Sequence, residues 1–177
     1  MTSSVSEIIT LRPLKQSDAE FLYNNVTDPD VIKQLRRLPD PYNLEHAYEF
    51  IALAGREALT GESGHFGVEV NGTGNLAGVI GALFSGNEVK QAEIGYWFAK
   101  REWGKGYASE AVRLMIEYLR SKKEIATVIA RVFENNPASA RVLIKNGFNK
   151  QGLSADQYCN VLNNSAVEEY KLILNPE

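Results

Sequence analysis

WGKGYAS (residues 103–109) separates a strand pattern at residues 91–98 from a helix pattern that begins at Tyr107. Gly104 and Gly106 carry no side chain, so backbone N–H groups can approach a ligand closely there. The first turn of the following helix adds N–H groups without partners inside the helix, together with the positive end of the helix dipole. The spacing therefore predicts an anion site of pyrophosphate size at this turn. The alternative is a glycine-rich turn that binds nothing.

Two common nucleotide-binding motifs fit this stretch less well. A Walker A loop requires Ser or Thr directly after its lysine, whereas Gly106 follows Lys105. The dinucleotide pattern GxGxxG is half met, because Ser109 stands where the third glycine belongs, although Glu124 lies roughly where a ribose-binding acid is expected. The turn also comes late in the chain, after strands that are joined as hairpins. A dinucleotide-binding fold is therefore the less favoured alternative.

Strand and helix patterns around this turn follow an order that is typical of a mixed sheet. Hairpin-type strands come first and a strand–helix–strand crossover comes later, which indicates helices on the faces of an α/β sheet in the broad sense. Ser17 with Glu20, Asp28 before Pro29, and Asn43 are predicted to begin the early helices. The predicted strands cover residues 8–14, 65–70, 76–84, 91–98, 126–133, 152–158 and 166–174.

Composition limits the classes of protein that the chain can be. Its 177 residues are 44% hydrophobic and 23% charged with a net charge of −3, which predicts one globular domain over residues 1–177. This charge disfavours non-specific binding to nucleic acid. The single cysteine, Cys159, excludes an intrachain disulfide and a cysteine-cluster metal site, and His46 and His65 have no metal-ligand spacing. Without a signal pattern or membrane-spanning run, we expect a cytoplasmic protein that has no nucleic acid, membrane or metal partner.

A second motif, NPASARVLIKNGF (136–148), follows the glycine turn at a spacing that resembles a known family. The chain is similar to the GNAT acyltransferase superfamily, and in particular to its ribosomal-protein-alanine N-acetyltransferase branch. The resemblance extends from Leu11 to about Leu174 and implies a mixed, mostly antiparallel central sheet of about seven strands flanked by helices. Trp103 stands where the family's phosphate loop usually has Gln or Arg. Three further segments carry the resemblance: WGKGYA (103–108), EIGYWF (93–98) and LRPL (11–14).

The resemblance implies that acetyl-CoA is the cosubstrate and suggests how it is bound. Backbone groups from Gly104 to Ala108 would hold the pyrophosphate, and the backbone of residues 96–98 would pair with the pantetheine arm like an added strand. That pairing requires the strand at 91–98 to separate from the strand at 126–133 and leave N–H and C=O groups free. Asn136, which also suits a helix cap, would hydrogen-bond the pantetheine. The expected cofactor-binding residues are Tyr96, Trp97, Phe98, Trp103, Gly104, Lys105, Gly106, Tyr107, Ala108, Asn136 and Ser139.

The expected reaction needs two proton movements. An ammonium group must lose a proton before it attacks the thioester, and the departing thiolate benefits from a hydrogen-bond donor. In the family that the chain resembles, transfer is direct within a ternary complex, so Cys159 is not needed as a nucleophile. The family's tyrosine acid is missing, because no tyrosine occurs between Asn136 and Tyr158. Ser139, which the resemblance places near the thioester sulfur, or water must therefore serve as the acid.

Glu93 is the first candidate for the base, because the resemblance places an acidic residue early in the strand that holds the pantetheine. The alternative is a structural carboxylate bonded to backbone or to an arginine. Glu69 is a weaker candidate. His65 has a suitable unperturbed pKa near neutrality, but its position at a strand start favours a packing role.

The sequence thus predicts an acetyl-CoA-dependent N-acetyltransferase that acts on a primary amine, either a protein N-terminus or a small molecule. The alternative is a GNAT-fold module that binds acyl-CoA without transferring the acyl group. The polar loops at residues 36–42 and 154–166 would flank the acceptor, but they match no acceptor signature. The acyl-chain preference stays open, as does the choice between monomer and homodimer.

Overall fold

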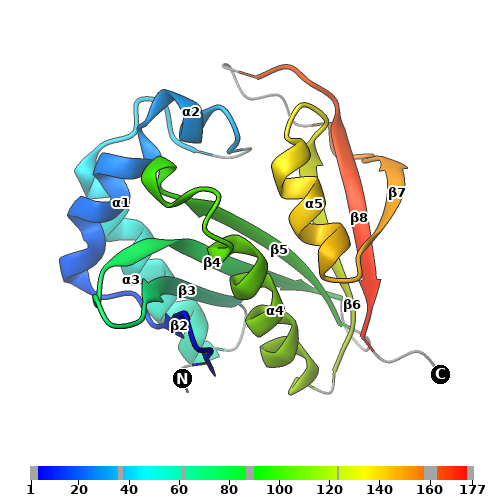
Figure 1. Cartoon of the computed structure of the whole chain (residues 1–177), viewed down its shortest axis with the longest axis horizontal. Coiled ribbons are helices and arrows are strands. Elements are labelled where there is room, and N and C mark those ends of the chain that lie inside the picture. Colours follow the sequence, from blue (N-terminus) through cyan, green and yellow to red (C-terminus); the bar gives the residue numbers. More distant parts are fainter. Residues whose placement is uncertain are drawn as a thin grey trace.

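A mixed β-sheet runs through the molecule and has eight strands within the described residues (Figure 1). The computed structural model describes residues 4–35, 38–60, 63–86, 90–122, 124–157 and 163–174. Neighbouring strands are antiparallel except for β5 and β6, which run parallel, so the predicted mixed and mostly antiparallel sheet is confirmed. A first strand of two residues accounts for the eighth. In spatial order the strands are β1 (Ser4–Val5), β2 (Ile9–Arg12), β3 (Ser63–Val70), β4 (Leu76–Ser85), β5 (Lys90–Phe98), β6 (Ile125–Phe133), β8 (Val167–Ile173) and β7 (Asn149–Leu153).

Helices cover both faces of this sheet (Figure 1). Side chains alternate between the two faces of a strand, and adjacent residues of β4 join different hydrophobic clusters. Ile80 packs on the face of the two later helices, whereas Val79 packs with Leu22 and Ile51 on the opposite face. The later helices are α4 (Tyr107–Arg120) and α5 (Pro137–Lys145), and the earlier ones are α1 (Ala19–Val26), α2 (Pro29–Ile32) and α3 (Leu44–Thr60). Two short 3-10 helices complete the described elements: η1 (Gln16–Asp18) and η2 (Lys100–Glu102).

Two of the three predicted helix starts are confirmed. The side chain of Asp28 accepts from the backbone N–H of Asp30 (2.8 Å), and that of Asn43 accepts from the backbone N–H of His46 (3.1 Å). The capping box predicted at Ser17 is wrong, because a 3-10 turn occupies this position. The carboxylate of Asp18 accepts the backbone N–H of Lys15 there (2.7 Å).

The parallel pair β5 and β6 separates along its length. Their ladder begins at Lys90 and Ile125 and ends at Ile94 and Ala130. Beyond that point β5 stays paired with β4 up to Phe98, while β6 stays paired with β8. We call the region between Gly95–Phe98 of β5 and Arg131–Phe133 of β6 the opening. The separation that the sequence analysis required for pantetheine binding is therefore present.

The C-terminal part of the sheet differs from the prediction in one strand. The strand predicted at residues 152–158 runs instead from Asn149 to Leu153, and it pairs with β8 through an irregularity between Lys150 and Gly152. The strand predicted at 166–174 is confirmed as β8. None of the helices in the described ranges is long and apolar enough to cross a membrane.

Candidate active site

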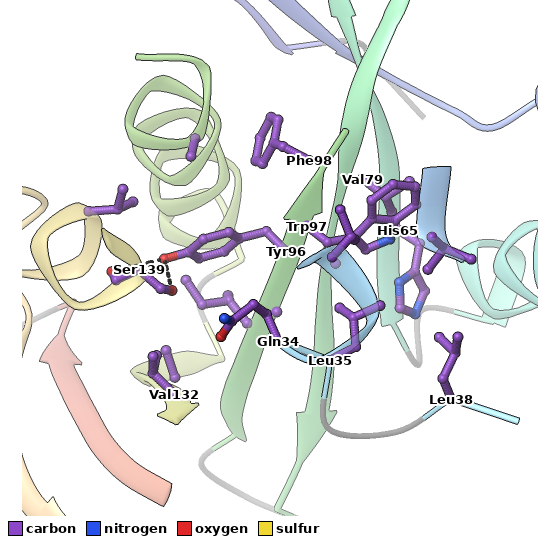
Figure 2. A pocket seen from close by; sticks show the side chains of 18 of the residues that line it. Gln34, Leu35, Leu38, His65, Val79, Tyr96, Trp97, Phe98, Val132 and Ser139 are labelled. Atoms are coloured by element: carbon purple, nitrogen blue, oxygen red, sulfur yellow. Dashed lines mark hydrogen bonds between the residues drawn. The ribbon is translucent and has the colours of Figure 1, made fainter. Parts of the chain in front are cut away.

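A cavity of about 1320 Å³ lies at the opening and reaches both faces of the sheet (Figure 2). On one side it is lined by the first turns of α4 and α5, including Tyr107 and Ser139. On the other side it is lined by α1 and α3, including Leu22 and Phe50, while β5 contributes residues from Glu93 to Phe98. We call these parts the α4–α5 side and the α1–α3 side. A ligand on one side can therefore meet a ligand on the other without either crossing the core.

The glycine turn borders the α4–α5 side. Gly104 and Gly106 have φ angles of +76° and +84°, which L side chains rarely adopt, so glycine is favoured at both positions. Gly106 is the N-cap of α4, whose first-turn N–H groups have no partner inside the helix. The indole N–H of Trp103 donates to the carbonyl of Phe98 (2.9 Å) and fastens the turn to the end of β5. This bond gives Trp103 a structural reason to replace the family's Gln or Arg.

Of the expected cofactor-binding residues, all except Lys105 line this cavity. The ammonium group of Lys105 is turned toward Glu102, with Nζ and Oε2 2.9 Å apart. Asn136 caps α5 as expected, since its Oδ1 accepts from the backbone N–H of Ser139 (3.1 Å). Trp97 projects to the α1–α3 side, where its ring stacks on Phe21 with 6.1 Å between centroids.

Ser139 has a partner that the sequence analysis missed. The hydroxyl of Tyr96 lies 2.8 Å from Ser139 Oγ and 3.2 Å from the Ser139 carbonyl oxygen (Figure 2). Burial raises the pKa of Tyr96 well above its usual value, so this phenol stays protonated. Two cations were also missed: Arg141 and Lys145 line the α4–α5 side one helical turn apart. Only their spacing after the Asn136 cap could have indicated this from the sequence.

Glu93 lines the cavity where β5 and β6 begin to separate. Its Oε2 lies 2.5 Å from Nη1 of Arg131, and the same guanidinium bonds Glu169 (3.0 Å) and Ser154 (3.0 Å). The arginine-bonded carboxylate that the sequence analysis kept as an alternative is therefore present. Glu93 also lines the cavity and keeps 24% of its side-chain surface exposed, so the ion pair leaves it accessible to a ligand.

The two weaker candidate bases differ in position. Glu69 bonds the guanidinium of Arg12 (2.5 Å between Oε2 and Nε) and is not among the residues that line the cavity. His65 does line the cavity, and its ring packs edge-on against Phe50. Burial lowers the pKa of His65, although Glu57, 3.5 Å from Nε2, acts in the opposite direction. His65 thus stays an alternative base on geometric grounds, and Glu69 does not.

The α1–α3 side is lined mainly by apolar residues, and a buried amide oxygen lies beside them. Within the described residues, Oε1 of Gln34 is buried and has no hydrogen-bond partner. Such an atom is costly to bury and indicates that a ligand N–H could satisfy it. Cys159 and Tyr158 lie outside the described residues, as do parts of both loops expected to flank the acceptor. The apolar lining on this side includes Leu22, Val26, Val31, Leu35, Leu38, Tyr42, Phe50 and Leu53.

An opened sheet beside a glycine turn, with a cavity that reaches both faces, is the arrangement that the resemblance implied for an acyltransferase that uses a coenzyme A thioester. The family model for the acetyltransferase (GNAT) domain matches residues 9–149. The uncharacterized N-acetyltransferase p20 of Bacillus licheniformis is 31% identical over 156 residues, which cover 88% of this chain and 87% of the relative. The chain therefore belongs to the GNAT family and is an acetyl-CoA-dependent N-acetyltransferase.

Solved structures agree with this fold. The ribosomal-protein-S5-alanine acetyltransferase from Vibrio fischeri superposes with a TM-score of 0.85 at 18% identity, covering 99% of this chain and 98% of that one. RimL, a ribosomal L7/L12 α-N-protein acetyltransferase in complex with coenzyme A, gives 0.83 at 18% identity, with coverages of 97% and 98%. At these identities the similarity is one of fold.

Proposed function

We propose that the protein moves an acetyl group from acetyl-CoA on the α4–α5 side directly to a primary amine on the α1–α3 side, as one catalytic domain. The observation that carries this proposal is the continuity of the cavity through the opening. The two substrates can meet there, so no acyl-enzyme intermediate is required.

The α4–α5 side supplies the kinds of group that acetyl-CoA needs. The turn from Gly104 to Ala108 would direct N–H groups at the pyrophosphate, assisted by the N-terminus of α4. The edge of β5 at the opening would pair with the pantetheine amides as an added strand does. Arg141 and Lys145 would neutralise phosphate charge at the cavity mouth. The carboxamide of Asn136 also lines the cavity and would hydrogen-bond the pantetheine.

Opposite faces of β5 would serve the two proton movements. Glu93 and Tyr96 stand an odd number of residues apart, so their side chains project to opposite faces. Glu93 would take the proton from the ammonium group on the α1–α3 side. The amine nitrogen would then bond to the acetyl carbon while the carbon–sulfur bond breaks, and the acylated nitrogen would release its second proton to solvent. Ser139 would donate a hydrogen bond to the departing thiolate.

The lining of the α1–α3 side favours an amine attached to an apolar body. Apolar and aromatic side chains would pack against that body, and Oε1 of Gln34 would accept one of its N–H groups. The carboxylates that line the cavity are Glu49, Glu93 and Glu102, and the last two pair with Arg131 and Lys105, whereas a polyamine or aminosugar would need several carboxylates directed at its amines. A protein N-terminus remains the better supported source, because RimL and the S5-alanine enzyme are described as acetylating ribosomal proteins.

The test is the release of coenzyme A thiol from acetyl-CoA in the presence of three kinds of amine. These are short peptides with a free N-terminus followed by apolar residues, 2-phenylethylamine, and spermidine, with each product identified by mass spectrometry. We expect acetylated peptide or phenylethylamine and little acetylated spermidine. Stabilisation by acetyl-CoA with no product from any amine would favour the binding-only alternative and contradict the proposal.

A further inference from the structure

The family's tyrosine acid has no counterpart at the expected place in this chain, because the sequence after Asn136 reaches position 158 before it contains a tyrosine. The structure brings a different tyrosine to the same region. Tyr96 belongs to β5 and precedes Ser139 by 43 residues in the chain. Its hydroxyl oxygen is 2.8 Å from Ser139 Oγ. The bond crosses from β5 to the first turn of α5 on the α4–α5 side (Figure 2).

Both partners of this bond are held in place by other contacts. The backbone N–H of Ser139 donates to Asn136 Oδ1, which holds the backbone of Ser139 in place, and the Ser139 hydroxyl hydrogen can rotate to suit its acceptor. The ring of Tyr96 packs against the main core cluster and lies edge-on to Phe98, with 6.5 Å between ring centroids. The two hydroxyl groups are therefore held in position before a ligand enters the adjoining part of the cavity.

We propose that Tyr96 is a positioning residue for the transfer reaction: its O–H donates to Ser139 Oγ, which directs the Ser139 O–H at the sulfur of acetyl-CoA. This inference rests on the proposed function. Without a charge nearby, the phenol hydrogen can go to Ser139 Oγ or to the Ser139 carbonyl oxygen, and in the second case Ser139 Oγ can donate to the phenol. A developing thiolate accepts only, so its negative charge favours the order Tyr96 to Ser139 to sulfur.

The proton balance keeps Tyr96 in one state throughout. An ammonium nitrogen that becomes an amide N–H gives up two protons: the first goes to Glu93 before the nitrogen–carbon bond forms, and the second goes to solvent as the carbon–sulfur bond breaks. The thiolate departs with a hydrogen bond from Ser139. Because burial raises the pKa of Tyr96, its phenol is too weak an acid to give up its proton to a thiolate. Tyr96 therefore polarises Ser139 and is not consumed, and solvent supplies the proton that the released thiolate takes up.

The test is a double-mutant cycle of Tyr96→Phe and Ser139→Ala. Thiol release gives kcat and KM with the best amine of the panel, and calorimetry gives the Kd of acetyl-CoA. We expect each single variant to lower kcat about 10- to 100-fold, the range for a hydrogen bond to a charged group, with the Kd of acetyl-CoA changed less than about twofold. The double variant should be no slower than Ser139→Ala alone, because Tyr96 acts through Ser139.

Tyr118→Phe is the matched control, since Tyr118 belongs to the same core cluster but does not line the cavity. It should leave kcat unchanged. Wild-type kcat for Tyr96→Phe, or losses that add in the double variant, would overturn the role of Tyr96 while leaving the proposed function intact. A wild-type protein that releases no thiol with any amine would overturn the proposed function and this inference together.

Discussion

Gly106 offers the sharpest test of the donor site, because the fold contains a glycine in the same conformation elsewhere. Gly106 has a φ of +84°, and a Cβ added there would meet no protein atom within 4 Å. Gly72, in the turn between β3 and β4, has a φ of +80° and equally open surroundings. Alanine at either position should therefore cost the same backbone strain, about 1 kcal/mol. For a chain of this size that corresponds to a fall in Tm of roughly 2–4 °C.

The two glycines should differ only in ligand binding. A methyl group at Gly106 would stand between the N–H groups of the α4 N-terminus and the pyrophosphate. Loss of one or two charge-assisted hydrogen bonds, each about 1.5–3 kcal/mol, would weaken the binding of acetyl-CoA at least tenfold. Gly106→Glu adds a negative charge; at about 5 Å and an effective dielectric of about 20, one unit charge on the ligand is repelled by about 3 kcal/mol. Binding of acetyl-CoA should then fall more than about 100-fold.

Isothermal titration calorimetry with acetyl-CoA measures the effect, and thermal denaturation without ligand measures the strain. Gly72→Ala and Gly72→Glu should lose stability but bind acetyl-CoA like the wild type. Wild-type affinity in Gly106→Glu would refute the assignment of this turn to the pyrophosphate. Equal losses of affinity at Gly72 and Gly106 would show that the effect arises from folding and not from the site.

Two further predictions concern the α1–α3 side of the cavity, and a third concerns the stability of the fold. Glu93→Gln should lower kcat about 100-fold or more if Glu93 is the base. Glu169 bonds the same arginine but does not line the cavity, so Glu169→Gln should change kcat little. Equal effects of the two variants would indicate a structural role for Glu93. Gln34→Leu should raise the KM for the amine about tenfold without changing the KM for acetyl-CoA. It should also raise Tm, because an unpartnered buried oxygen is removed. An unchanged KM for the amine would exclude a contact between the amine and Gln34. Asp18→Asn should cost about 2–3 kcal/mol at neutral pH in urea unfolding, since it breaks the bonds between Asp18 and Arg12. Burial alone would raise the pKa of Asp18, but its hydrogen bonds and the charge of Arg12 outweigh burial, so the pKa is lowered. The contribution of Asp18 to the free energy of unfolding is therefore present above about pH 4 and is lost as the pH falls through the lowered pKa. A cost of Asp18→Asn that does not shrink on acidification would contradict the assignment.

The parts of the fold and site that could be predicted are those encoded locally. The glycine turn, the strand before it and the caps at Asp28, Asn43 and Asn136 each depend on residues within a few positions of one another. The placement of the glycine turn and of the Asn136 cap beside one cavity agrees with the resemblance that the two motifs carry and with the predicted strand–helix–strand crossover. The exception at Ser17 has a local cause as well, because the carboxylate of the next residue, Asp18, accepts the backbone N–H of Lys15 and also binds Arg12.

The contacts that escaped prediction join residues far apart in the sequence. Glu93 and Arg131 meet because β5 and β6 pair in one register, which no pattern along the chain specifies. Tyr96 and Ser139 are 43 residues apart, and the periodicity of β5 gives only the face on which Tyr96 lies. The buried oxygen of Gln34 depends on how the segment after α2 packs over the sheet, which sequence spacing leaves undetermined.

The central claim, that the glycine turn and the opening bind acetyl-CoA, is tested most directly by thermal denaturation with acetyl-CoA, coenzyme A, NAD and ATP in parallel. At 100 times its Kd, a ligand that binds only the folded state adds about 2.7 kcal/mol. For a chain of this length that predicts a rise in Tm of about 5–10 °C with acetyl-CoA and coenzyme A, and little change with NAD or ATP. A rise with NAD or ATP and none with coenzyme A would contradict the account.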